Sequence, residues 1–226
     1  GKAGREITQR AIPVLTAQHG IDLVIANVEN SAAGFGVTGD IAETILRCGV
    51  DVVTSGNHIW DKKEVLEYIP RQPRLLRPAN FPSGVPGRGT WMGKTRTGEP
   101  VAVINVMGRI FMQPLDDPFA VVLKEIEAVR GKTRVIIVDF HAEATSEKAA
   151  MGWHLDGRVT AIFGTHTHVQ TADERLLPKG TAYLTDVRMT GPYDSIIGVT
   201  VDAALSRFVS RMPSKFEAAT EPARLK

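Results

Sequence analysis

Polar side chains follow four separate apolar runs of the sequence, at the point where each run ends. Each run is short and rich in β-branched residues, which is typical of a buried strand. Ligand crevices in open α/β sheets form at the carboxyl ends of the strands, so we expect these side chains to share one edge. They are Glu29 and Asn30 after residues 22–28, Asn57 and His58 after residues 51–56, His141 after residues 134–140, and His166 and His168 after residues 159–165.

His166 and His168 are the sharpest signal in this set. Two residues apart in an extended segment, their side chains would lie on one face. Their neighbours in GTHTHV are small or hydroxylic and leave room for a metal ion. A single histidine at a strand end is more often a hydrogen-bonded structural residue, so the prediction depends on the convergence of the whole set.

The candidate donors form a mixed nitrogen and oxygen set without thiolate. Three imidazoles, a carboxylate and one or two amides suit manganese, iron or zinc better than calcium. They exceed the four ligands of a tetrahedral zinc, which favours a two-metal centre with a bridging carboxylate. Two metals roughly 3.5–4 Å apart hold a bridging hydroxide and polarise the attacking and leaving oxygens of a phosphoryl group. The set therefore predicts phosphoester hydrolysis.

Strands and helices alternate along the chain, which predicts an α/β architecture. The short connection between the last two strands indicates a mixed sheet. Residues 77–100 are rich in Pro and Gly and are expected to form a loop within one domain. Asp61 is expected to cap the helix that follows it. The expected strands are 22–28, 51–56, 101–107, 134–140, 159–165, 181–187 and 195–201, and the expected helices are 40–49, 62–69, 118–129 and 146–155, after a helix at the start of the chain.

Composition restricts the class of protein further. The 226 residues are 43% hydrophobic and 23% charged, as in a globular domain with a buried core. A net charge of +2 without a basic stripe argues against a nucleic-acid or membrane partner. The single cysteine, Cys48, excludes an internal disulfide and is compatible with a reducing compartment, so the cytoplasm is the expected location. The oligomeric state is left open, a homo-oligomer included.

Five separated motifs carry a resemblance to a known family. IANVENSAAGFGVT, GVDVVTSGNHIWDKKE, RLLRPANFP, VDFHAEATSEK and GTHTHVQTADERLLPKGTAYLTDVRMTGPYDSIIG occur in family order and span nearly the whole chain. In these motifs the sequence resembles the bacterial YmdB-like family of calcineurin-type metallophosphoesterases. The resemblance implies a four-layer α/β/β/α sandwich, with mixed sheets flanked by helices, formed as a single domain by residues 1–226. It also implies two divalent metals, iron or manganese with zinc as the alternative, and hydrolysis of 2′,3′-cyclic nucleotides and other small phosphodiesters.

The same resemblance implies a role for each candidate residue. His58 would be the general acid that protonates the leaving oxygen after attack by a metal-bridging hydroxide, a role that suits an imidazole because its pKa lies near neutrality. The implied metal ligands are Glu29 as the bridge and Asn57, together with His141 and His166 for one metal and His168 for the other; Asn30 lies at the same site.

The sequence departs from the family pattern at three places. The family begins with a strand ending in Gly-Asp, whose aspartate is a ligand, and we expect such residues to precede Gly1. The family also runs on into a short strand beyond the position of Lys226. Arg188 stands where the family commonly has glycine, and Arg109 follows another strand end. Both arginines are candidates for substrate contact, with a surface change or a structural ion pair as the alternatives.

Two other functions compete with hydrolysis of phosphodiesters. A regulatory protein that senses a nucleotide or metal, with weak or no turnover, is favoured by the missing aspartate. A metal-dependent amidohydrolase also uses a His-x-His pair, but at the first strand of its barrel. In this sequence the pair comes late in the chain and follows Asn57 and His58, which disfavours that alternative.

Overall fold

The larger of two facing sheets positions most of the candidate residues. The computed structural model describes residues 1–213, 215, 217–220 and 223–224. In this part of the chain the large sheet has the order β3-β4-β5-β6-β8-β7, with β4, β5, β6 and β8 parallel and the edge strands β3 and β7 antiparallel. The expectation of a mixed sheet is therefore confirmed. Its strands are β3 (Thr90–Lys94), β4 (Pro100–Met107), β5 (Val135–His141), β6 (Ala161–Thr165), β7 (Arg175–Leu176) and β8 (Ala182–Leu184).

The smaller sheet carries the other candidate residues. Strands β1 (Ile25–Asn27) and β2 (Val52–Thr54) are parallel, with Ile25 opposite Val52. Single bridges from Val53 to Leu75 and from Leu76 to Arg88 extend it. A separate antiparallel pair joins β9 (Gly191–Pro192) to β10 (Ala223–Arg224). Glu29 follows β1 and Asn57 follows β2, so the two parallel strands deliver both side chains to the same edge.

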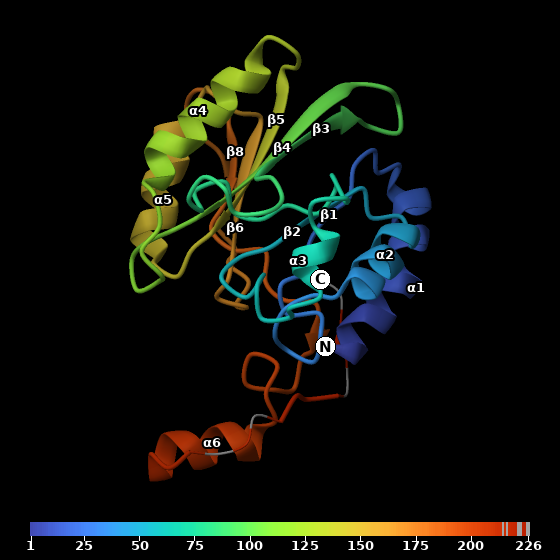
Figure 1. Cartoon of the computed structure of the whole chain (residues 1–226), viewed down its shortest axis with the longest axis vertical. Helices are drawn as coiled ribbons and strands as arrows, with labels where there is room; N and C mark the ends of the chain where they lie inside the picture. Colours follow the sequence, from blue (N-terminus) through green and yellow to red (C-terminus); the bar gives the residue numbers. More distant parts are fainter. Residues whose placement is uncertain (214, 216, 221–222, 225–226) are drawn as a thin grey trace.

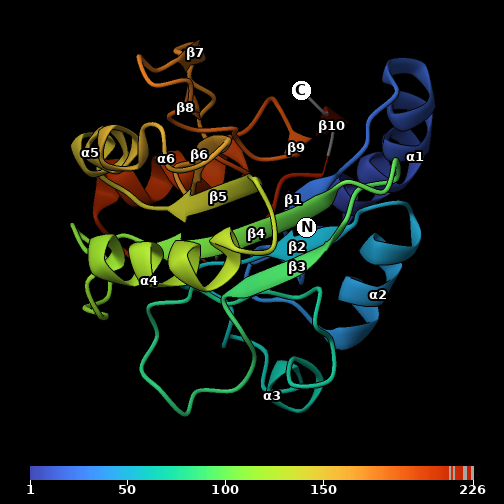
Figure 2. The same cartoon turned by 90° about the horizontal axis from the view of Figure 1, so that it is seen from above.

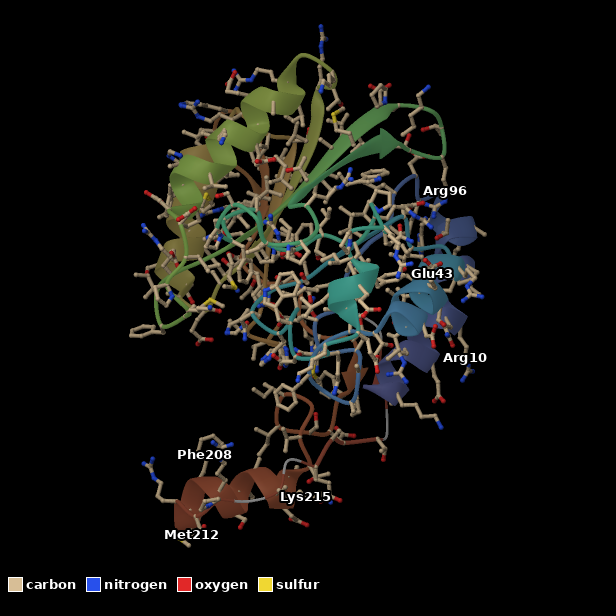
Figure 3. All side chains as sticks on the ribbon, viewed as in Figure 1. Arg10, Glu43, Arg96, Phe208, Met212 and Lys215 are labelled. Atoms are coloured by element: carbon tan, nitrogen blue, oxygen red, sulfur yellow. The ribbon has the colours of Figure 1, made fainter. Side chains whose placement is uncertain are left out.

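Helices cover the outer faces of the two sheets. Helices α4 (Pro118–Arg130) and α5 (Thr145–Leu155) lie on the side of the large sheet, and α1 (Lys2–His19) and α2 (Gly39–Arg47) on the opposite side (Figures 1 and 2). The fold is thus the expected four-layer sandwich with mixed sheets flanked by helices. Helix α3 (Val65–Tyr68) is a single turn. Helix α6 (Val201–Ser210) projects from the body, with Phe208 labelled on it and Met212 just beyond its end in Figure 3.

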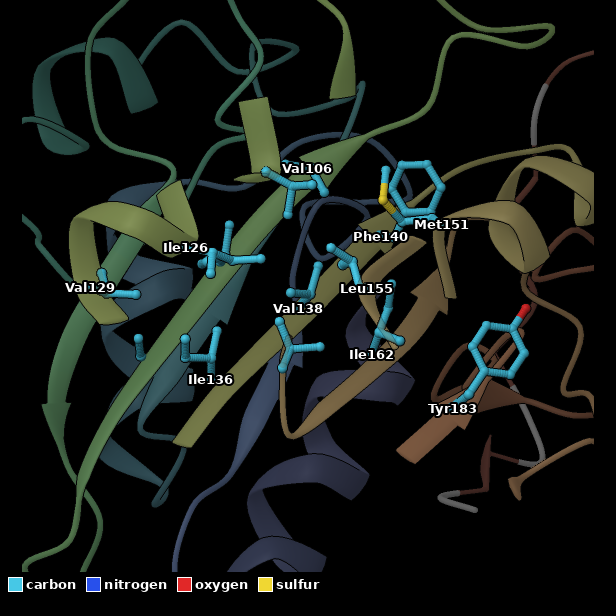
Figure 4. Packing of buried hydrophobic residues seen from close by; sticks show 14 of the residues in the cluster. Val106, Ile126, Val129, Ile136, Val138, Phe140, Met151, Leu155, Ile162 and Tyr183 are labelled. Atoms are coloured by element: carbon cyan, nitrogen blue, oxygen red, sulfur yellow. The ribbon is translucent and has the colours of Figure 1, made fainter. Parts of the chain in front are cut away.

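Among the described residues, apolar packing holds the layers together in three places. The largest cluster fills the space between the large sheet and helices α4 and α5, with Phe140, Ile126 and Met151 fully or almost fully buried (Figure 4). A second cluster lies beneath α2 and α3. A third, small cluster joins the sheets to each other through Val52 and Val103. Burial of apolar surface in all three places stabilises the arrangement of the strand ends.

Three sequence expectations for the elements are wrong. Residues 195–201 are not a strand, because Ile197 and Gly198 both have positive φ and fold the segment into a tight turn closed by a bridge from Ile196 to Val199. Residues 77–100 are not all loop, since β3 lies within them and pairs with β4. Asp61 does not cap a helix. The residues after it form turns, and α3 begins only at Val65.

Among the described residues, no helix is both long enough and apolar enough to cross a membrane.

Replacing Ile126 by Ala should destabilise the fold strongly. The side chain is fully buried between α4 and the large sheet, so the substitution leaves a cavity and should cost about 2–5 kcal/mol. Leu66 on α3 is 45% exposed, and Leu66→Ala is the control, expected to stay within about 1 kcal/mol of the wild type. Urea unfolding measures the free energy of unfolding of both variants, and an equal loss in the two would contradict this account of the core.

Candidate functional site

The Nε2 atom of His141 is the centre of the candidate site. It lies 3.0 Å from Asn57 Oδ1, 3.1 Å from Glu29 Oε1 and 3.1 Å from His166 Nδ1. Asn57 Oδ1 and Glu29 Oε1 are acceptors, and a ring nitrogen is one too when it carries no proton, so a proton on His141 Nε2 could serve only one of the other three atoms. The donor atoms of Glu29, His141 and His166 all lie within 4.8 Å of one another. A bound cation would satisfy the cluster, and its nitrogen and oxygen donors suit manganese, iron or zinc.

A hydrogen-bond chain determines which nitrogen of His141 faces this cluster. Thr165 Oγ1 donates to Asp139 Oδ1 at 2.7 Å and lies 2.9 Å from His141 Nδ1. Because the hydroxyl has one proton and gives it to Asp139, it accepts from the Nδ1–H of His141. The Nε2 atom then keeps its lone pair for a ligand. Metal-binding histidines commonly donate their other ring N–H to a fixed acceptor in this way.

The other two histidines are oriented in the same way. His166 Nε2 lies 3.1 Å from the carboxylate of Glu143, which leaves Nδ1 to face His141. His168 Nδ1 lies 3.1 Å from the carbonyl oxygen of Ile197, which leaves Nε2 toward Asn30. In each case a carboxylate or carbonyl accepts from one ring nitrogen, so the other presents a lone pair. Each of the three imidazoles is thus oriented so that one ring nitrogen faces the site.

The charges that act within the cluster are those present before a cation binds. Glu29 is buried, and burial alone would raise its pKa, but the charge and hydrogen bond of His141 and the backbone N–H of His58 outweigh burial and lower the pKa to about 2. Burial, followed by the charge of His141, lowers the pKa of His166 to about 4. At neutral pH the site therefore offers an ionised carboxylate and an uncharged His166 imidazole.

Asn30 lies between Glu29 and His168. Its Nδ2 atom is 2.9 Å from His168 Nε2 and 3.5 Å from Glu29 Oε1. Its Oδ1 atom is buried and has no hydrogen-bond partner among the described residues. Buried polar oxygens are normally satisfied, so this oxygen is a further candidate donor. Together with His168 Nε2 it marks a second donor group, joined to the first through Glu29.

The loop that carries His166 and His168 is not extended, so the expectation of an extended segment is wrong. Both residues have positive φ, 99° and 65°, and their rings face different partners. Asp186 supports the loop, accepting from Thr167 Oγ1 at 2.8 Å and from Thr167 N at 3.3 Å. Lys148 forms a buried ion pair with the same carboxylate at 2.6 Å. The strained loop is held in place by these contacts.

His58 lies beside the donor cluster, with a different set of contacts. Its backbone N–H donates to Glu29 Oε2 at 3.2 Å, and its Nδ1 atom lies 2.8 Å from Asp61 Oδ2. The Phe35 ring meets the imidazole edge-on, with centroids 5.0 Å apart. A cavity of about 430 Å³ adjoins both His58 and the donor cluster. Its lining residues are Asn57, His58, Asp61, Phe111, Met112, Gln113 and His166.

Neither Arg109 nor Arg188 lines this cavity. Arg109 pairs with Asp117, with 3.3 Å between Nη2 and Oδ1. The Arg188 guanidinium lies over the ring of Tyr193, 4.1 Å from the centroid. The contact of Arg109 is the structural ion pair that the sequence left open as an alternative.

The residues that support the site and were missed in the sequence include Asp139 of β5, which accepts from Thr165. Glu143 follows His141 by two residues, and an extended His-x-Glu segment places both on one face, so a signal was present. Thr165 is a hydroxyl residue next to His166, which is a weak signal. Lys148 and Asp186 fall within two of the five motifs, but neither residue type nor spacing marked them for the site. Their role depends on the tertiary contacts of α5 and the segment after β8.

The fold is a four-layer sandwich of the metallophosphoesterase type, with its donor cluster at the carboxyl edge of both sheets. The chain belongs to the YmdB-like protein family, whose model matches residues 1–226. A Bacillus subtilis (strain 168) protein named 2′,3′-cyclic-nucleotide 2′-phosphodiesterase is 49% identical over 97% of this chain and 83% of its own length. A crystal structure of a hypothetical protein from Thermus thermophilus matches with a TM-score of 0.91 at 45% identity, over 98% of this chain and 85% of that one. The structure of a novel phosphatase from Mycoplasma pneumoniae also has a TM-score of 0.91, at 36% identity over 99% and 81% of the two chains.

Replacing Gly56 by Ala should weaken metal binding. A Cβ atom at this position would overlap the ring of His141, which must then move away from Asn57 and Glu29. We expect Mn²⁺ affinity, measured by calorimetry, to fall on the order of 10-fold or more. Gly131→Ala is the control, because nothing lies near its Cβ and its φ is −73°. Unchanged Mn²⁺ affinity in a folded Gly56→Ala protein would contradict the placement of His141.

Proposed function

We propose that this protein is a metal-dependent phosphodiesterase that hydrolyses small phosphodiesters, with 2′,3′-cyclic nucleotides as the favoured substrates. The convergence of Glu29, His141 and His166 beside an open cavity is the observation that carries the proposal. The name of the Bacillus subtilis relative supports the substrate class, and the name of the Mycoplasma pneumoniae structure supports phosphoester chemistry.

The proposed metal ligands form two groups that share Glu29. Asn57, His141 and His166 would hold one ion, and His168 with Asn30 would contribute to a second. Divalent ions bound there, iron or manganese with zinc as the alternative, would supply positive charge to the phosphoryl oxygens and lower the pKa of the attacking water. Glu29 is suited to the shared position because both of its oxygens face site residues.

His58 would act as the general acid. Asp61 accepts from its Nδ1–H, which fixes the orientation of the ring. The Nε2–H is then the proton available to a leaving oxygen in the cavity that His58 lines. The backbone N–H bond to Glu29 fixes the distance between this acid and the metal donors. Asp61 therefore has the role of orienting the acid in place of the helix cap expected from the sequence.

We further propose that residues 1–226 act as one domain. Met107 at the end of β4 packs in the cluster beneath α2 and α3, and Val103 packs against Val52, so the two sheets share their cores.

A cytoplasmic location stays a prediction of the sequence.

A turnover panel tests the proposed activity. The protein should hydrolyse adenosine 2′,3′-cyclic phosphate and bis-p-nitrophenyl phosphate with added Mn²⁺ or Fe²⁺, and lose that activity in a chelator. A protein that binds metal and nucleotide but turns over none of these phosphodiesters would overturn the proposal in favour of a sensing role.

Replacing His58 by Ala should lower kcat by about 10²- to 10⁴-fold, since a general acid contributes that much. Metal content, measured by elemental analysis, should stay near the wild-type value because the proposed ligand atoms are retained. Asp61→Asn should show a smaller loss of kcat, because the acid remains but its orienting carboxylate is removed. If His58→Ala kept full turnover on the cyclic nucleotide, another group would have to be the acid.

A further inference from the structure

We propose that Phe111 is a specificity residue that stacks on the base of a nucleotide whose phosphate lies beside His58. The inference rests on the proposed phosphodiesterase function and deepens it. Phe111 is 90% exposed and has a left-handed φ of 60°, yet it lines the same cavity as His58 and His166. Phe111 thus borders the space in which the substrate of those residues must lie.

The loop that carries Phe111 is held firmly at its base. The buried carboxylate of Glu147 accepts from Arg109 N at 2.9 Å and from Ile110 N at 3.3 Å. Gly108 N donates to the carbonyl oxygen of His141 at 2.9 Å, which links the loop directly to a proposed metal ligand. These bonds fix the backbone up to the residue before Phe111. The position of its ring is therefore tied to the position of the site.

The next residue anchors the loop on the other side. Met112 is partly buried and packs against two apolar clusters, the one under α4 and α5 and the one beneath α2 and α3. Phe111 beside it remains exposed to solvent. A left-handed backbone disfavours a bulky residue, and an exposed phenyl ring gains no burial energy. Both costs fall on one residue at the edge of the cavity. Contact with an apolar, flat ligand group would recover the second cost, because it would cover the exposed ring.

A nucleobase is the ligand group that fits this position. The cavity of about 430 Å³ is within the range of small-molecule sites and extends from the proposed acid His58 to Phe111. Stacking on a phenyl ring tolerates every base, since each base has a flat π-face. Gln113 lines the same cavity and has an amide that can bond to a base edge. The proposed specificity is therefore for phosphodiesters that carry a base, with weak preference among bases.

The test compares a substrate that has a base with one that lacks it. For Phe111→Ala we expect KM for adenosine 2′,3′-cyclic phosphate to rise on the order of 10-fold, the usual effect of losing one stacked ring. The kinetics of glycerol 1,2-cyclic phosphate, which has no base, should be unchanged. Phe111→Trp should restore the low KM. Phe208→Ala is the control, because it removes another exposed ring, 68% exposed on α6, and should leave the kinetics of both substrates unchanged.

The outcomes separate this inference from the proposed function. Turnover of both substrates with no selective effect of Phe111→Ala would overturn the stacking role and leave the phosphodiesterase intact. That result would point instead to a surface for a protein partner. If the wild type hydrolyses neither substrate, calorimetry measures instead how tightly the wild type and Phe111→Ala bind adenosine 2′-monophosphate and glycerol 2-phosphate. Weaker binding of the nucleotide alone in Phe111→Ala would support the stacking role, and equal binding by both proteins would overturn it.

Discussion

The crowding of lone pairs around His141 Nε2 is the constraint on which the rest of the structure depends. Three other acceptor atoms lie 3.0–3.1 Å away, and the described residues bring too few protons to satisfy all of them. His141 and Glu29 are buried, and Asn57 and His166 are half-buried at the edge of the cavity. Buried polar atoms without partners are costly, so such a cluster persists only when the surrounding fold holds it or positive charge neutralises it. The fold supplies the first condition, and we propose that divalent metals supply the second.

Asp139 is the point at which the fold holds the site together. The carboxylate is fully buried and accepts from Thr54 of β2 at 2.5 Å and from Thr165 of β6 at 2.7 Å. Burial raises the pKa of Asp139, while the hydroxyl groups and the charge of His141 act in the opposite direction. One side chain thus joins the small sheet to the large one and, through Thr165, orients His141. Packing of the two sheets and geometry of the site are therefore a single network.

The sequence predicted the strand ends well because their signal is local. Apolar runs set β1, β2, β5 and β6, and the residue after each run must lie at the sheet edge, so the meeting of Glu29, Asn57, His141 and His166 followed from pattern alone. The backbone of residues 166–168 did not follow, since its left-handed conformation depends on Asp186, which comes from a distant segment. Asp61 was misassigned for a similar reason. Its carboxylate could cap a helix or bond to His58, and only the tertiary structure shows which.

Anomalous diffraction from crystals soaked with Mn²⁺ tests the central claim most directly. We predict one peak roughly 2.0–2.3 Å from His141 Nε2, His166 Nδ1 and a Glu29 oxygen, and a second beside His168 Nε2 that shares Glu29. His141 should bind through Nε2, with Thr165 retained on Nδ1. Peaks only at surface carboxylates, or coordination of His141 through Nδ1, would contradict the claim that these lone pairs are arranged to hold metal.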